Sequence, residues 1–199
     1  MKTTIFLTVV LALSPFMVFG QDQKIVQPTE KKSTLTMDEL VQQDHKLELA
    51  ELADYHKKTE TELVKYNGLV AVRNILTEKL KRAIKDGDET LVEVAVQDLV
   101  NNKADLLYAA KWIVAEYGGS MMQAAKSAYR FRLITEEDYT KHLVFFRQVK
   151  ARTEEPAPAE LVSLIGEARQ KVPIYFKILK DAGRPMPVDE PKTIPSPKK

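Results

Sequence analysis

Residues 77–100, TEKLKRAIKDGDETLVEVAVQDLV, contain the turn around which two long helical patterns are arranged. The segment Asp86-Gly87-Asp88 separates an earlier pattern, over residues 36–85, from a later one over residues 88–117. In the later pattern apolar side chains recur at the spacing of one helix face. These side chains are Leu91, Ala95, Leu99, Leu106, Ala110, Ile113 and Tyr117. Together the two patterns predict a long antiparallel helical hairpin.

The ends of the second helix are also predicted by local signals. Asp86 can accept a backbone N–H bond three residues further on, and Glu89 places negative charge in the first turn. Gly118-Gly119 follows the last apolar residue of the stripe, where glycine commonly ends a helix. We therefore expect this helix to end at Gly118.

The earlier pattern is longer than its partner. At about 1.5 Å per residue it spans about 75 Å, against about 45 Å for the second arm. It fits one helix, or two helices with a break near Asn67-Gly68. The N-terminal half of the first arm therefore needs another cover. Either the later helices or a second copy of the chain would provide it, and the tethered later helices are the preferred interpretation.

Further helix signals follow the hairpin. Ser120 and Thr135 stand at positions typical of helix N-caps, and Pro158 suits the first turn of a last helix. Pro173 is expected to kink that helix and Gly183 to end it. The chain is therefore expected to be all-α, an elongated helical bundle of about five helices built on the hairpin.

The sequence divides into four parts. Residues 1–20 read as a signal peptide, residues 21–35 as a flexible leader, residues 36–183 as one helical-bundle domain and residues 184–199 as a disordered tail rich in proline and lysine. The 179 residues after the signal are enough for one ordinary domain with a sizeable core.

The first 20 residues predict export. They contain one early lysine, a short apolar run, and Val18 and Gly20 at the small-residue positions before a cleavage site, which we place after Gly20. No later stretch of the sequence is long and apolar enough for a transmembrane segment. The chain has no cysteine, so neither a lipidated cysteine nor a disulfide framework is available. We expect a periplasmic or extracellular location, reached through a Sec-type signal peptide.

Charge and motifs restrict the function. Removal of residues 1–20 takes one lysine from the 30 basic residues, which leaves 29 against 28 acidic residues and a net charge of +1. A nucleic-acid partner is not expected at this balance. The sequence lacks His-Glu-x-x-His, Gly-x-Ser-x-Gly and the glycine-rich phosphate-binding patterns. No cofactor is predicted, and an enzyme is the less favoured class, although paired carboxylates could act on a glycan.

One polar cluster is a candidate for chemistry. His45 and His56 lie eleven residues apart and so share a helix face, Glu48 is near them in sequence, and His142 points inward from another helix. Imidazoles with a carboxylate can bind a transition metal. However, His45 and His56 are more than about 15 Å apart along an unbroken helix, so they cannot bind one ion together. Packed or partner-facing histidines are the preferred interpretation, and no metal site is predicted.

Two further groups are candidates for an interaction surface. Tyr108 and Trp112 lie four residues apart on the side opposite the main stripe, where they either pack beneath later helices, the preferred interpretation, or contact a partner. Lys126, Arg130 and Arg132 belong to a segment, residues 126–152, with seven basic and three acidic residues. A solvated face is the preferred interpretation of this segment, and a weak contact with an anionic envelope polymer or lipid headgroup is the alternative.

The plan of signal peptide, long hairpin and smaller helical part resembles that of several envelope helper proteins, including minor pilus components of conjugation machines. The likeness is architectural, since no motif carries it. The predicted function is a non-enzymatic interaction or structural component of the cell envelope, whose partner is another envelope protein or a second copy of the chain. The alternative is a periplasmic enzyme or metal-handling protein with its site among Glu48, His56 and His142.

Overall fold

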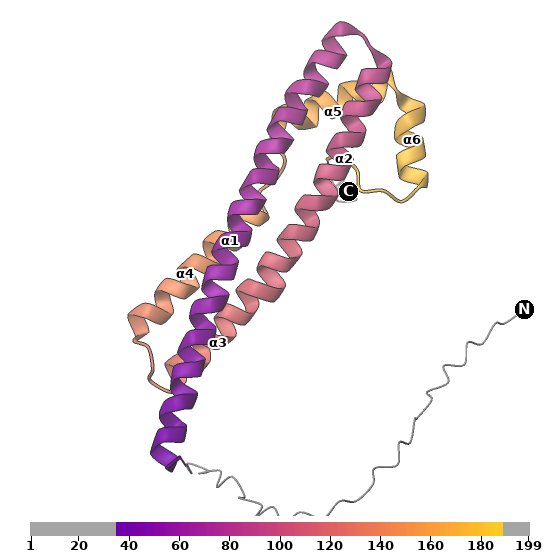
Figure 1. Ribbon diagram of the computed structural model, residues 1–199. Helices are drawn as coiled ribbons and strands as arrows, with labels where there is room; N and C mark the ends of the chain where they lie inside the picture. The colour runs from indigo at the N-terminus through magenta and orange to yellow at the C-terminus, as the bar shows by residue number, and fades with distance from the viewer. Residues whose placement is uncertain (1–34, 189–199) are drawn as a thin grey trace, which may run out of the picture. The chain divides into compact units, whose positions relative to one another are not determined.

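A computed structural model describes residues 35–188, which contain only helices and turns. The all-α class and the helical bundle are thus confirmed (Figure 1). The predicted signal peptide, nearly all of the predicted leader and residues 189–199 lie outside the described residues. The elements are α1 (Met37–Asp86), α2 (Glu89–Lys111), the π-helix η1 (Trp112–Gly118), α3 (Gly119–Arg130), α4 (Glu136–Thr153), α5 (Ala159–Lys171) and α6 (Pro173–Asp181).

The first arm is one helix of 50 residues without a break at Gly68. Its start is fixed by a capping box in which the Thr36 hydroxyl accepts from the Glu39 N–H and the Glu39 carboxylate accepts from the Thr36 N–H. A Cβ placed on Gly68 would meet nothing within 4 Å. Gly68 therefore lies in open space within a continuous helix, and the single-helix alternative is the one observed.

The chain reverses between α1 and α2 at Gly87. This residue has φ +72°, the left-handed conformation that glycine adopts without a Cβ clash, and the Asp88 N–H donates to the Ala83 carbonyl at 3.2 Å. Asp88 then caps α2 by accepting from the Leu91 N–H at 3.0 Å. The prediction of Asp86 as the cap was wrong, because Asp86 is still the last residue of α1.

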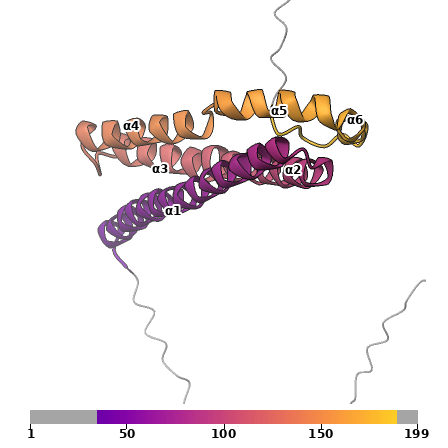
Figure 2. The same ribbon diagram turned by 90° about the horizontal axis from the view of Figure 1, so that it is seen from above.

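The largest core lies at this end of the bundle. α1 contributes Leu80 and Ile84, and α2 contributes the neighbouring Val92 and Val96. α5 and α6 cover them, so α2 buries two adjacent faces. The covering residues are Leu161, Leu164, Ile165, Ala168, Phe176 and Leu179. Figure 2 shows α4 and α5 following one another along one side of the other helices.

The predicted helix end at Gly118-Gly119 is wrong, as is the predicted N-cap at Ser120. Both glycines have right-handed helical dihedral angles, and the chain stays helical from Glu89 to Arg130 through η1. Gly118 is buried, and its lack of a side chain is explained by close packing and not by a helix end. A Cβ there would lie 2.8 Å from a ring carbon of Phe146 and 2.8 Å from the Ile113 carbonyl oxygen. The missing side chain lets α4 approach closely instead of ending the helix.

The later helices cover part of the N-terminal half of α1, around Leu52, where we expected them. Leu52 on α1 packs with Met121, Ala125 and Ala128 on α3, and Phe146 of α4 closes the same cluster. The first turns of α1 are not covered: Val41 and Leu49 are 45% and 38% exposed.

Local signals also place the remaining helices. Thr135 caps α4 by accepting from the Asp138 N–H at 3.1 Å, as predicted. Pro173 does more than kink the last helix: Val172, with φ −126° and ψ 58°, separates α5 from α6, and Pro173 begins α6. Within the tail predicted from residue 184 onward, Met186 and Val188 instead pack against the core, and Pro187 is buried. None of the described helices has the length and apolar character needed to cross a membrane.

Gly118 and Gly119 form a matched pair for testing the close approach of α4. We expect Gly118→Ala to lower the free energy of unfolding by about 1–3 kcal/mol, the usual cost of overpacking. Gly119→Ala, whose Cβ would have its nearest neighbour at 3.6 Å, should be neutral or stabilise by up to about 1 kcal/mol through helix propensity. Urea unfolding measures both, and equal effects would contradict the packing explanation.

Candidate functional site

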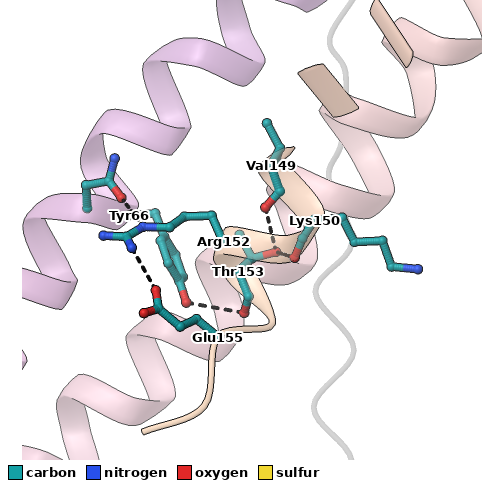
Figure 3. Close-up of polar contacts among 7 residues, drawn as sticks. Tyr66, Val149, Lys150, Arg152, Thr153 and Glu155 are labelled. Carbon is teal, nitrogen blue, oxygen red and sulfur yellow. Dashed lines mark hydrogen bonds and ion pairs between the residues drawn. The ribbon is translucent and has the colours of Figure 1, made fainter. Parts of the chain in front are cut away.

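The end of α4 is attached to α1 by polar contacts that Figure 3 shows together. The Tyr66 hydroxyl donates to the Thr153 carbonyl at 3.3 Å, and Arg152 donates from Nε to the Asn67 side chain at 3.1 Å. Arg152 also bonds Glu155 through Nη1 at 2.7 Å. Burial raises the pKa of Tyr66, which keeps its hydroxyl protonated as a donor at neutral pH. These contacts fix where the chain leaves α4 and enters the turn before α5.

A cavity of about 570 Å³ lies beside this junction, between α1, α2 and the α4–α5 turn. Tyr66, Arg73 and Asn102 supply polar groups to its wall. Asn102 is only 5% exposed and donates from Nδ2 to the Leu69 carbonyl at 3.1 Å. Its Oδ1 and the Nε of Arg73 are both buried without a hydrogen-bond partner in the described part of the chain. None of these three residues was among the functional candidates predicted from the sequence.

Both unpartnered residues interrupt an apolar stripe, which is the signal that could have identified them. Arg73 lies one turn after Leu69 and one turn before Leu76 on α1. Asn102 stands at the corresponding place on α2, between Leu99 and Leu106. A charged residue and an amide at stripe positions of two neighbouring helices indicate a polar interior contact or a ligand site.

Two of the four residues in the predicted polar cluster meet. The rings of His56 on α1 and His142 on α4 are 5.2 Å apart in an edge-on arrangement, and Phe145 stacks on His56 at 4.5 Å. Glu60 approaches His56 Nδ1 at 3.7 Å. His142 Nδ1 is buried without a partner among the described residues.

The other two members bind elsewhere or stay apart. Glu48 accepts from the Ser127 hydroxyl of α3 at 3.2 Å, and its second oxygen, Oε2, is buried without a partner in residues 35–188. The structure shows no contact between His45 and the His56–His142 pair. Within residues 35–188, no group of three or more His, Asp or Glu side chains is arranged to hold a metal ion.

The aromatic pair at the junction of α2 and η1 lies on the surface. Tyr108 is 66% exposed and Trp112 is 39% exposed, so the preferred interpretation, packing beneath the later helices, was wrong. The two rings contact edge-on with centroids 6.2 Å apart, and Tyr117 extends the group at 6.4 Å from Trp112. These three residues are called the aromatic patch below.

The three basic candidates surround the end of α3. Lys126, Arg130 and Arg132 are exposed, and none forms a salt bridge to another described residue. Arg132 also shapes the chain: it has φ +57°, and the N–H of Leu133 donates to the Ala128 carbonyl at 2.8 Å to close α3.

The histidine pair predicts a pH dependence of stability. Burial lowers the pKa of His142 and the neighbouring His56 lowers it further, while Asp138 opposes both. A pKa below the ordinary value of 6.5 means that the unfolded chain takes up a proton more readily than the folded protein. This contribution is fully present above pH 6.5 and is lost as the pH falls through the lowered pKa.

We expect the unfolding midpoint of the wild type to decrease when the pH is lowered from 7.5 to 5. Glu60, which faces His56, and Asp138 are the acidic groups that offset part of this loss. His142→Phe and His142→Gln should both give a smaller fall, measured by circular dichroism at each pH. A fall of unchanged size in both variants would rule out His142 as its source.

Comparisons of the chain with protein-family models, curated proteins and solved structures find no match. The function must therefore be inferred from the contacts described above.

Proposed function

We propose that the protein is an exported, non-enzymatic helical protein that binds a partner in the cell envelope through the aromatic patch. The exposure of Tyr108 on α2 and of the neighbouring Trp112, the first residue of η1, is the observation that supports binding. The pattern of residues 1–20 supports export. The partner is another envelope protein or a second copy of the chain.

The patch has the chemistry of a binding hot spot. Tyrosine and tryptophan dominate the energetics of many protein interfaces, because each combines a large apolar area with a polar group and few rotatable bonds. Covering on the order of 150 Å² more of these rings would contribute about 4 kcal/mol at about 25 cal/mol per Å². That is large enough for two side chains to decide whether a partner binds.

The location of the patch suits such a role. Trp112 is the first residue of η1, and π-helical segments inside α-helices often occur at functional sites. Ile113, on the opposite side of this segment, is buried and packs against α1. A rigid, packed helix therefore presents the rings, so little conformational entropy is lost when a partner covers them.

Alanine substitution tests the patch. We expect Tyr108→Ala and Trp112→Ala each to reduce complex recovery at least tenfold, measured by affinity capture from the envelope fraction and by light scattering for self-association. Phe131→Ala is the matched control, since Phe131 is 59% exposed but belongs to the end of α3. Equal recovery of all three variants and the wild type would exclude the patch as the interface.

Export gives a separate expectation. The mature protein should begin at Gln21, with residues 1–20 removed, when it is recovered from the envelope or the medium of the producing cell. Intact-mass measurement of the recovered protein determines this. Recovery of only the full-length chain would contradict cleavage after Gly20.

A further inference from the structure

We infer that the cavity beside the α4–α5 turn binds a small amphipathic carboxylate that carries an O–H or N–H group near its acid end. The carboxylate would pair with Arg73, the donor group would bond the Asn102 side-chain oxygen, and the apolar part would lie on the leucines of the wall. The volume of about 570 Å³ falls in the range of small-molecule sites. This inference does not depend on the aromatic patch.

Arg73 provides the positive charge. Its Nε is buried without a partner, and the guanidinium makes no hydrogen bond or ion pair to any residue in 35–188. Leaving a buried donor on a permanent charge unpaired is costly, whereas a carboxylate can pair with the planar guanidinium through two bonds. An anion in the cavity would therefore be bound by a group that the fold has left unsatisfied.

Asn102 provides an acceptor of defined direction. The Leu69 carbonyl can only accept, so the amide nitrogen of Asn102 must face it, and Oδ1 is the atom left unpaired. Leu69 and Arg73 are one turn apart on α1, which places the amide and the guanidinium on the same face of that helix. A ligand that only accepts hydrogen bonds would leave Oδ1 unsatisfied. The site therefore favours an acid with its own donor.

The remaining wall favours a single negative charge and an apolar body. Glu154 and Glu155 line the cavity, where Lys150 and Arg152 pair with them. The two carboxylates still disfavour a ligand of higher negative charge, such as a phosphate. Lys103 also lines the cavity, but it already has an interaction. The apolar lining consists mainly of Leu99, Leu106, Leu107, Leu161, Val162 and Val188.

Two sources share this chemistry, a hydroxy fatty acid and an N-acylated amino acid. Isothermal titration of the purified protein should use 3-hydroxyoctanoate and N-acetyl-leucine as the two probes. Octanoate, which lacks the donor, and 1,3-octanediol, which lacks the charge, are the matched control ligands. We expect at least one of the two probes to bind at least tenfold more tightly than both octanoate and 1,3-octanediol, and the stronger probe identifies the source.

Two variants assign the atoms. Arg73→Gln should weaken the stronger probe at least tenfold, whereas Arg82→Gln, an exposed arginine of the same helix away from the cavity, should not. In Asn102→Ala the preference for 3-hydroxyoctanoate over octanoate should disappear, which remains measurable even if both bind more weakly. Circular dichroism confirms that each variant is folded.

Three results would overturn the inference. They are no heat of binding for either probe, equal binding of the neutral diol, and unchanged binding by folded Arg73→Gln. Trp112→Ala should leave probe binding unchanged, so failure of the cavity and failure of the aromatic patch are distinguishable.

Discussion

The packing of α1 against α2 across the turn at Gly87 is the constraint on which the other contacts depend. Gly87 reverses the chain in a conformation that only glycine adopts cheaply, and Asp88 begins the next helix at once. Because almost no chain is spent in the turn, Leu80 and Val92 are already in the same core. Further from the turn, Lys79 meets Asp98 and Asn102 meets the Leu69 carbonyl. Each later helix then packs on a pair whose register is set.

The start of α4 and the chain reversal at Gly87 were predictable from the sequence, because their signals are local. Thr135 and Gly87 act through atoms within a few residues of themselves, so the sequence pattern contains the whole cause. Gly118 was misread because its cause is distant in sequence: it is small to admit Phe146 of α4. Leu91 shows the same limit. It fits the stripe of the second helix but is 45% exposed, while its neighbour Val92 is fully buried by the later helices.

The candidate sites divide along the same line. The His56–His142 contact could be anticipated only as two inward-facing residues, since one sequence does not show which helices meet. The exposure of Tyr108 and Trp112 depends on which face the later helices cover, and they cover the other one. Arg73 and Asn102 are recognisable in the sequence, because each is a polar residue at an apolar-stripe position of one of two adjacent helices. A helix stripe defined by its apolar residues alone omits these positions, although a buried polar residue is the more informative observation.

The π-helix explains why a rotation of 100° per residue does not predict which side chains beyond η1 face α1. Met121 is eight residues after Ile113, and eight α-helical residues turn about 800°, which would place Met121 about 80° away around the axis. A π turn holds an extra residue, so the rotation is closer to that of seven residues, and Met121 returns to within about 20° of Ile113. Both side chains are buried, at 1% and 0% exposure, and both belong to clusters with α1 residues. The same inserted residue that keeps α3 facing α1 lies in the segment that presents Trp112 on the other side. The packing of the bundle and the proposed binding surface therefore share one local distortion.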